Sequence, residues 1–225
     1  GSGSTLGSVL LQDPRVAGVA FTGSTATAWS INRTLAAREC AIAPLIAETG
    51  GQNAMIVDSS ALPEQVVMDV LSSAFQSAGQ RCSALRVLFV QEEIAPRVLE
   101  MLKGAMAELV IGDPALLATD VGPVIDEDAR TSLEVHREAM KTQGQLIYEC
   151  KIDTATTQSG TFVAPTIFEL SSLTPLTQEV FGPILHIIRF KGSALEQVVE
   201  QINQLKFGLT FGLHTRLDTR MQEVA

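Results

Sequence analysis

The sequence predicts an α/β fold built around a mostly parallel sheet. Short apolar runs alternate with longer helical patterns along the whole chain, which is the pattern of repeated strand–helix–strand units. The 225 residues are 46% hydrophobic and 18% charged, so the chain can bury a substantial core. No apolar run is long enough to span a membrane as a helix.

Charge and cysteine content narrow the class of protein further. The net charge is −9 and the pI is about 4.8, which argues against a nucleic-acid partner or an anionic membrane surface. Three cysteines form no disulfide framework, and the chain has no signal-peptide pattern. We therefore expect a cytoplasmic protein, with peripheral membrane association of a longer protein left open.

The first elements form half of a βαβ unit. An apolar run at residues 16–22 predicts a buried strand, and Gly23, Ser24 and Thr25 form a turn before a helix at residues 26–37. Backbone N–H groups at the start of such a helix suit a phosphate. The G-x-G-x-x-G dinucleotide fingerprint is absent, so this signal is weak by itself.

The rest of the chain continues the alternation, with a polar loop expected at residues 154–160. Predicted strands cover residues 54–57, 86–91, 146–149, 162–168, 184–190 and 209–214. Predicted helices cover residues 6–12, 63–77, 94–110, 127–142 and 193–205, and another begins at residue 218.

Cys82 follows the end of an amphipathic helix and a Gly79-Gln-Arg81 turn. A glycine here lets the backbone approach another group closely, such as a substrate. The positive charge of Arg81 favours thiolate over thiol, so Cys82 is a candidate nucleophile. The alternative is a buried small hydrophobe, which most free cysteines are. We interpret Cys40 and Cys150 as structural or incidental.

Two further segments carry a glutamate and a glycine within a few residues of each other. Glu48 ends an apolar run and precedes Gly50 and Gly51, where it can face a cleft or lie in a solvated loop. Glu179 begins the segment Glu-Val-Phe-Gly-Pro, which leads into the strand predicted at residues 184–190.

The three histidines lie far apart in sequence and lack ligand spacing, so no metal site is expected. We interpret His136 as part of a solvated helix face and His186 as a satisfied core residue. His214 ends the last predicted strand.

Four motifs, in this order and spacing, resemble the aldehyde dehydrogenase superfamily. They are Phe-Thr-Gly-Ser at residues 21–24, Glu-Thr-Gly-Gly at 48–51, Gly-Gln-Arg-Cys at 79–82 and Glu-Val-Phe-Gly-Pro at 179–183. Residues 45–62, 77–87 and 208–216 look like the glutamate-semialdehyde (1-pyrroline-5-carboxylate) dehydrogenase module of the bacterial bifunctional proline utilization A family. A generic aldehyde dehydrogenase more often has Leu where Thr49 stands and Lys where Gln52 stands.

The resemblance implies NAD-dependent oxidation of L-glutamate γ-semialdehyde to L-glutamate through a cysteine thioester. Cys82 matches the nucleophile and Glu48 the general base for thioester hydrolysis. The positions that match cofactor contacts are Gly23 and Ser24 near the pyrophosphate, Glu179 at the nicotinamide ribose and Phe181 near the nicotinamide. Ser83, Phe211 and Gly212 match the anchor for the substrate carboxylate.

The resemblance also implies how the chain is organised. Residues 1–48 match the C-terminal part of an NAD-binding domain, and residues 49–225 match the catalytic domain. We expect a fragment of a longer homo-oligomeric polypeptide, inactive alone, whose FAD would belong to a proline dehydrogenase domain outside this chain. The first five residues resemble native sequence more than an expression scar. The alternatives are another semialdehyde dehydrogenase, such as one for succinate semialdehyde, and a non-catalytic homologue.

Overall fold

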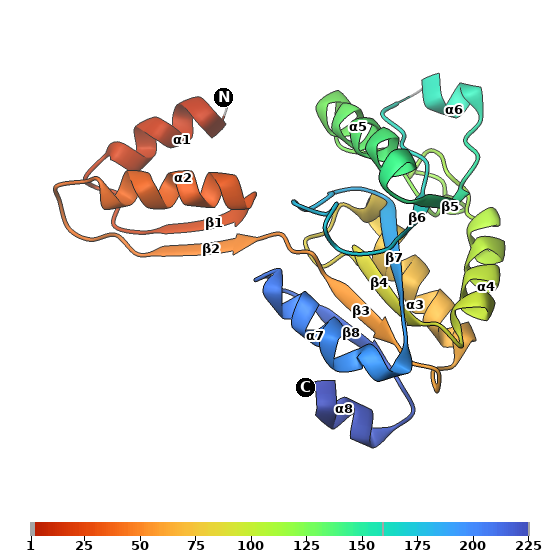
Figure 1. Ribbon diagram of the computed structural model, residues 1–225. Coiled ribbons are helices and arrows are strands. Elements are labelled where there is room, and N and C mark those ends of the chain that lie inside the picture. The colour runs from red at the N-terminus through yellow and green to blue at the C-terminus, as the bar shows by residue number, and fades with distance from the viewer. Residues whose placement is uncertain (1–2, 159, 225) are drawn as a thin grey trace. The chain divides into compact units, whose positions relative to one another are not determined.

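The computed structural model describes residues 3–158 and 160–224, and the chain divides into two compact units, Gly1–Gly50 and Gly51–Ala225 (Figure 1). The division falls two residues beyond the boundary expected after residue 48. Gly1, Ser2 and Ser159, on which parts of the expectations for the first residues and the 154–160 loop fall, lie outside the described residues.

The first unit contains two helices and a pair of parallel strands. Its elements are α1 (Gly3–Gln12), β1 (Val19–Gly23), α2 (Thr25–Ala36) and β2 (Leu45–Thr49). The Ser24 hydroxyl caps α2 by accepting a hydrogen bond from the backbone N–H of Thr27 at 3.2 Å, and this fixes where the helix begins. The predicted strand–turn–helix arrangement is therefore present, but the strand begins at Val19 rather than residue 16 and is largely exposed rather than buried.

The second unit is organised around a six-stranded sheet with the order β5-β6-β7-β4-β3-β8. All neighbouring strands are parallel except β5 and β6, which are antiparallel. The strands are β3 (Ala54–Val57), β4 (Val87–Gln91), β5 (Gln145–Glu149), β6 (Thr166–Leu170), β7 (Ile184–Phe190) and β8 (Phe211–His214). The mostly parallel α/β fold is confirmed.

Helices cover both faces of this sheet. They are α3 (Pro63–Phe75), α4 (Ala95–Ala107), α5 (Glu127–Gln143), α6 (Thr154–Gln158), α7 (Leu195–Gln204) and α8 (Asp218–Val224), with short 3₁₀ turns at Gln76–Gly79 and Gly192–Ala194. The crossovers from β3 to β4 and from β7 to β8 run in opposite directions across the sheet. Because such crossovers are right-handed, α3 and α7 cover opposite faces (Figure 1). All residues of β3 and β4 are accordingly buried.

Two element predictions in the second unit are corrected by the structure. The expected loop at residues 154–160 includes the helix α6, because Asp153 accepts a hydrogen bond from the backbone N–H of Thr156 at 2.7 Å and caps it. The strand expected from residue 162 begins only at Thr166, after Pro165, which has no N–H to donate to a ladder.

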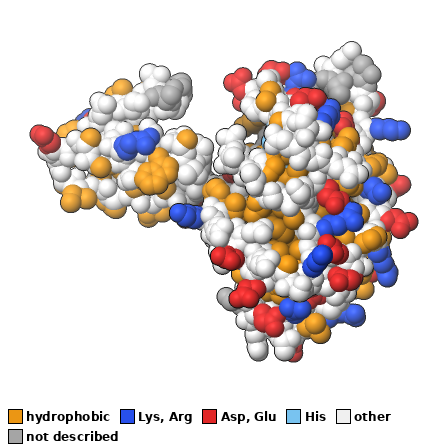
Figure 2. Space-filling view, in the orientation of Figure 1, with side chains coloured by type: hydrophobic (Ala, Val, Ile, Leu, Met, Phe, Trp, Pro, Cys, Tyr) orange, Lys and Arg blue, Asp and Glu red, His pale blue; other side chains and the backbone are white. Residues whose placement is uncertain are grey.

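The surface agrees with the charge balance of the sequence. On the face of the second unit seen in Figure 2, acidic and basic side chains are interspersed and no broad basic area is present. Among the described residues, no helix is both long and apolar enough to cross a membrane.

Candidate active site

Cys82 follows a tight turn made by three successive residues with left-handed backbone conformation. Ser77, Ala78 and Gly79 have φ angles of 55°, 54° and 65°. Non-glycine residues adopt this conformation at a cost of about 1–2 kcal/mol each, so packing must hold the turn. A Cβ at Gly79 would lie 2.3 Å from the carbonyl oxygen of Gly182. The glycine expected to admit a substrate thus admits the backbone of Gly182, and Cys82 is exposed after it.

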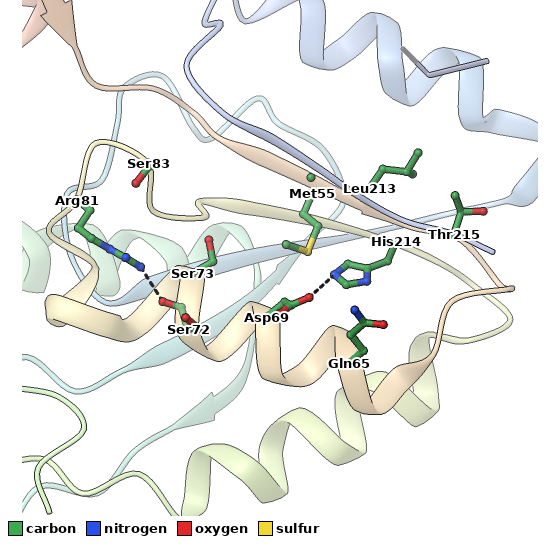
Figure 3. Close-up of a pocket in the computed structure, with 11 residues that line it drawn as sticks. Met55, Gln65, Asp69, Ser72, Ser73, Arg81, Ser83, Leu213, His214 and Thr215 are labelled. Carbon is green, nitrogen blue, oxygen red and sulfur yellow. Dashed lines mark hydrogen bonds and ion pairs between the residues drawn. The ribbon is translucent and has the colours of Figure 1, made fainter. Parts of the chain in front are cut away.

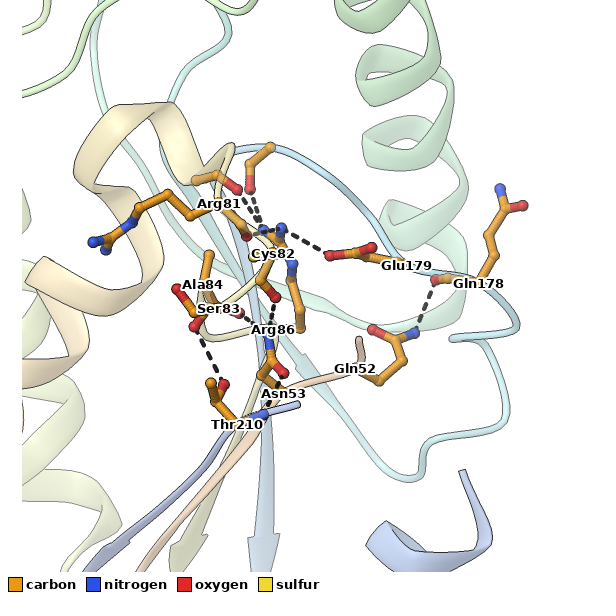
Figure 4. Close-up of polar contacts among 12 residues, drawn as sticks. Gln52, Asn53, Arg81, Cys82, Ser83, Ala84, Arg86, Gln178, Glu179 and Thr210 are labelled. Atoms are coloured by element: carbon orange, nitrogen blue, oxygen red, sulfur yellow. Dashed lines mark hydrogen bonds and ion pairs between the residues drawn. The ribbon is translucent and has the colours of Figure 1, made fainter. Parts of the chain in front are cut away.

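Arg86 is fully buried and binds the backbone of this turn (Figure 4). Its Nη1 donates to the carbonyl oxygens of Gly79 at 2.7 Å and Gly182 at 3.2 Å. Its Nη2 donates to the carbonyl oxygen of Arg81 at 3.1 Å. A guanidinium presents its donors in a fixed plane, which suits the binding of several carbonyls together. Arg86 therefore stabilises the turn that presents Cys82.

The same guanidinium binds the segment that carries Glu179 and Phe181. Nη2 of Arg86 lies 3.1 Å from Oε1 of Glu179, and the ring of Phe181 lies with its centroid 5.2 Å from Cζ of Arg86. Burial lowers the pKa of Arg86, while the charge and hydrogen bond of Glu179, and the charge of Cys82, act to raise it. The cysteine turn and the Glu179 segment are thus joined through one cation.

Arg81 does not occupy the position that the sequence suggested. Its Nη2 donates to the carbonyl oxygen of Ser72 at 2.8 Å, and its side chain points away from Cys82 (Figure 4). The cation that interacts electrostatically with Cys82 is Arg86. Arg86 was missed because a single arginine before a buried strand gives no signal of what it contacts.

The three expected substrate-anchor residues separate into two groups. Ser83 and Gly212 line one cavity of about 630 Å³, together with Arg81 and His214 (Figure 3). Phe211 lines a different cavity of about 410 Å³, because successive residues of a strand face opposite sides of the sheet.

His214 lines the same cavity as Ser83 and Gly212. Its Nε2 is 3.3 Å from Oδ2 of Asp69 on α3 (Figure 3). The cavity therefore combines an acidic group with hydroxyl and cationic groups.

The structure brings His136 and His186 together, which corrects the interpretation of His136 as part of a solvated helix face. Their Nε2 atoms are 2.9 Å from each other, and His136 is half-buried rather than solvated. His186 Nδ1 faces the carbonyl oxygen of Arg86 at 3.2 Å and must donate to it. His136 therefore donates to Nε2 of His186. Burial lowers the pKa of His186 to about 3.

Gly23, Ser24 and Glu48 belong to the first unit and lie at one edge of its strand pair. Gly23 ends β1, Ser24 caps α2, and Glu48 is exposed on β2 opposite Thr22. This is the carboxyl edge of the parallel strands, where α/β proteins commonly bind ligands.

The site residues of the second unit lie at the amino ends of its parallel strands, whereas those of the first unit lie at a carboxyl edge. Cys82 precedes β4, Phe181 precedes β7, and Thr210 precedes β8. All three thus lie at the amino ends of parallel strands. The general rule for α/β sheets would have located the site at the other edge.

Two buried amides beside the site also escaped the sequence analysis. Gln52 Nε2 donates to the carbonyl oxygens of Leu176 at 3.3 Å and Gln178 at 2.8 Å, which holds the approach to Glu179. Asn53, next in sequence, binds the backbone around Cys82. In the sequence, Gln52 stood out only as a departure from the lysine common in the family, and Asn53 gave no signal of a role.

Comparison with known proteins agrees with this architecture. The family model described as the aldehyde dehydrogenase family matches residues 1–225. The chain belongs to the aldehyde dehydrogenase family. The four motifs that suggested this family are thus supported over the whole chain.

Individual relatives within the family are more specific. The chain is 54% identical to the bifunctional protein PutA of Escherichia coli (strain K12), over 100% of this chain and 18% of that protein. It is 31% identical to 1-pyrroline-5-carboxylate dehydrogenase of Geobacillus kaustophilus, over 96% of this chain and 42% of that protein. The chain therefore spans about a fifth of the length of PutA, and its resemblance to that protein is confirmed.

Solved structures give the same result for the fold. A crystal structure of a bifunctional proline utilization A protein superposes with a TM-score of 0.94 at 53% identity, covering 98% of this chain and 22% of that chain. A 1-pyrroline-5-carboxylate dehydrogenase from Thermus with bound NAD superposes with a TM-score of 0.89 at 30% identity, covering 99% and 43%.

Proposed function

We propose that this chain forms part of an NAD-dependent dehydrogenase that oxidises L-glutamate γ-semialdehyde to L-glutamate. The structural observation that carries the proposal is the binding of both the Cys82 turn and Glu179 by the buried guanidinium of Arg86. The choice of substrate is supported by the names of the relatives, PutA and 1-pyrroline-5-carboxylate dehydrogenase.

In this proposal Cys82 is the nucleophile. Its thiolate attacks the aldehyde carbon, and the resulting adduct becomes a thioester when hydride leaves that carbon. Its exposure after the left-handed turn supports access by a substrate. The buried cation of Arg86 interacts electrostatically with Cys82 and hydrogen-bonds the turn that presents it.

The residues of the chain fit NAD, which when bound supplies the hydride acceptor. Arg86 binds Oε1 of Glu179, while Oε2 makes no hydrogen bond to the described residues and can accept one from a ribose hydroxyl. Phe181 is 44% exposed, so its ring can pack against a nicotinamide. At the first unit, Ser24 and the start of α2 offer hydrogen-bond donors to a pyrophosphate.

Glu48 is proposed as the general base for the second half of the reaction. A carboxylate that takes a proton from water lets the resulting hydroxide attack the thioester carbon, which releases L-glutamate and restores the Cys82 thiol. Glu48 is exposed at the carboxyl end of β2 and can meet solvent water.

Ser83 and Gly212 are proposed to bind the carboxylate of the substrate at its far end. They line one polar cavity, which suits a charged rather than an apolar substrate. Phe211, which lines the other cavity, is proposed to contribute through its backbone.

The wider context of the segment is also a proposal. Since the chain spans 18% of PutA, we expect it to act within a longer polypeptide, with any FAD bound outside this segment. We expect the isolated segment to bind NAD weakly and to show no turnover, which calorimetric titration would test. Three free cysteines suit a reducing, cytoplasmic location, and we expect a homo-oligomer.

A substrate panel tests the proposal. The full-length protein would be assayed for NADH formation with glutamate γ-semialdehyde, succinate semialdehyde and propanal. The highest kcat/KM is expected for glutamate γ-semialdehyde. Preference for succinate semialdehyde would contradict the substrate, and oxidation of none would favour a non-catalytic homologue. Cys82→Ala should abolish turnover, whereas the matched variant Cys40→Ala should retain it.

A further inference from the structure

We infer that Asn53 is a positioning residue that ties the nucleophile loop (residues 80–85) to the substrate-anchor loop (residues 207–212). This inference rests on the proposed function. Asn53 precedes β3, which lies between β4 and β8. Ala54 pairs with Val87 on one side and with Phe211 on the other. The strand register therefore puts Asn53 between the residue that precedes β4 and the one that precedes β8.

The side chain of Asn53 uses its hydrogen-bonding groups on both sides (Figure 4). Nδ2 donates to the carbonyl oxygens of Cys82 at 2.7 Å and Ala84 at 2.9 Å. Oδ1 accepts from the backbone N–H of Thr210 at 3.2 Å. These partners fix the orientation of the amide, because a flipped amide would set oxygen against two carbonyl oxygens and nitrogen against an N–H.

The side chain of Asn53, which bridges the two loops, is buried. Asn53 is only 4% exposed, so water cannot easily replace its bonds. Its own carbonyl oxygen accepts from the backbone N–H groups of Arg86 at 3.0 Å and Val87 at 3.1 Å, which holds the residue in place. Thr210 Oγ1 donates to the carbonyl oxygen of Ser83 at 3.4 Å and adds a second link between the loops. The nucleophile and the anchor are thus held in one fixed relation.

Removing the side chain of Asn53 should affect the kinetics with the aldehyde but not those with NAD. A small displacement of a nucleophile can lower a rate by about 100-fold. Asn53→Ala should therefore lower kcat/KM for the aldehyde by roughly 10- to 100-fold and raise its KM, with the KM for NAD unchanged. A general loss of folding stability would not change the KM for the aldehyde while leaving the KM for NAD unchanged.

Gln91 provides a matched control at the other end of β4. It is also a buried amide, with Oε1 accepting from the N–H of Ser59 at 3.1 Å and Nε2 donating to Glu93 at 2.8 Å. Gln91→Ala should lower stability comparably while leaving kcat/KM unchanged. Should Asn53→Ala not fold, Asn53→Ser keeps a short polar group and takes its place.

Hydrogen exchange of the full-length protein, followed by mass spectrometry, tests the inference independently of activity. In Asn53→Ala or Asn53→Ser, exchange should rise together at residues 80–85 and 207–212, and in Gln91→Ala it should not. Unchanged exchange in both segments, or equal effects of the Asn53 and Gln91 variants, would overturn the inference. If the wild-type protein oxidised no aldehyde, the proposed function would fail, while the exchange comparison would still decide whether Asn53 ties the loops.

Discussion

The guanidinium of Arg86 and the carboxylate of Glu179 form a partly buried ion pair with a separation of 3.1 Å, although 93 residues separate them in sequence. Nη1 and Nη2 of the same guanidinium also bind the backbone of the turn before Cys82. In the proposed mechanism, this pair joins the nucleophile to the residue that binds the nicotinamide ribose.

Replacing Arg86 with Lys should weaken NAD binding. A lysine keeps the charge but cannot bind Glu179 and the carbonyls of Gly79 and Arg81 together. Since a hydrogen bond to a charged group contributes about 1.5–3 kcal/mol, we expect the KM for NAD to rise roughly 10- to 100-fold. Arg189→Lys is the matched control, because Arg189 pairs with Glu169 at a more exposed position. Equal effects of both variants in steady-state kinetics would refute the role of Arg86.

Replacing Gly79 with Ala should destabilise the second unit. The new Cβ would lie 2.3 Å from the carbonyl oxygen of Gly182 and 2.8 Å from that of Ala74, and neither backbone can move easily. We expect a loss of about 2–4 kcal/mol in the free energy of unfolding. Gly104→Ala is the control, since it lies inside α4 with nothing within 4 Å, and it should stabilise by about 0.5–1 kcal/mol. Urea unfolding of both variants would measure the difference, and a neutral Gly79→Ala would contradict the close contact.

The three cysteines should differ in alkylation. Burial raises the pKa of Cys150 to about 12, so at pH 8 it should resist iodoacetamide in the folded protein. Cys82 and Cys40 are exposed and should react. Prior incubation with the aldehyde should protect Cys82 alone. Peptide mapping by mass spectrometry would show this, and protection of Cys40 instead would remove Cys82 from the proposed role.

Acid should destabilise the second unit through His186. Burial lowers the pKa of His186 from 6.5 to about 3 in the folded state, so the unfolded chain binds a proton at this residue more readily. The contribution of neutral His186 to the free energy of unfolding is therefore complete above pH 6.5 and is lost progressively as the pH falls toward 3. At pH 5.5 the loss should be about 1.4 kcal/mol. His186→Gln does not titrate and should remove this part of the pH dependence. Hydrogen exchange of β7 in urea at pH 7.5 and 5.5 would compare the two, and parallel losses would exclude His186 as the cause.

Elements with strong local patterns could be predicted from the sequence. The strands Ala54–Val57 and Ile184–Phe190 were located with their observed bounds, and α5 began at the predicted Glu127. Continuous apolar runs and regular helical spacing are carried by neighbouring residues, so they can be recognised without the rest of the fold.

The contacts that organise the site could not be predicted in this way. Arg86 and Gly182 are 96 residues apart, and Asn53 and Thr210 are 157 apart. His136 and His186, 50 residues apart, were interpreted as a solvated residue and a core residue, with no contact between them predicted. These partners depend on strand order, which alternation alone does not specify. Cys82 was a candidate nucleophile from its local turn, whereas Glu179 was given a role only because whole motifs resembled a family.

In the proposed mechanism, Cys82 forms a thioester that Glu48 helps to hydrolyse. The most direct measurement is mass spectrometry of the Cys82 peptide after the full-length Glu48→Gln protein is mixed with NAD and glutamate γ-semialdehyde. We predict an acyl adduct on Cys82 that accumulates with a burst of NADH and is released by hydroxylamine, whereas the wild-type protein retains little of it. An unmodified Cys82, or an adduct on another residue, would contradict the account.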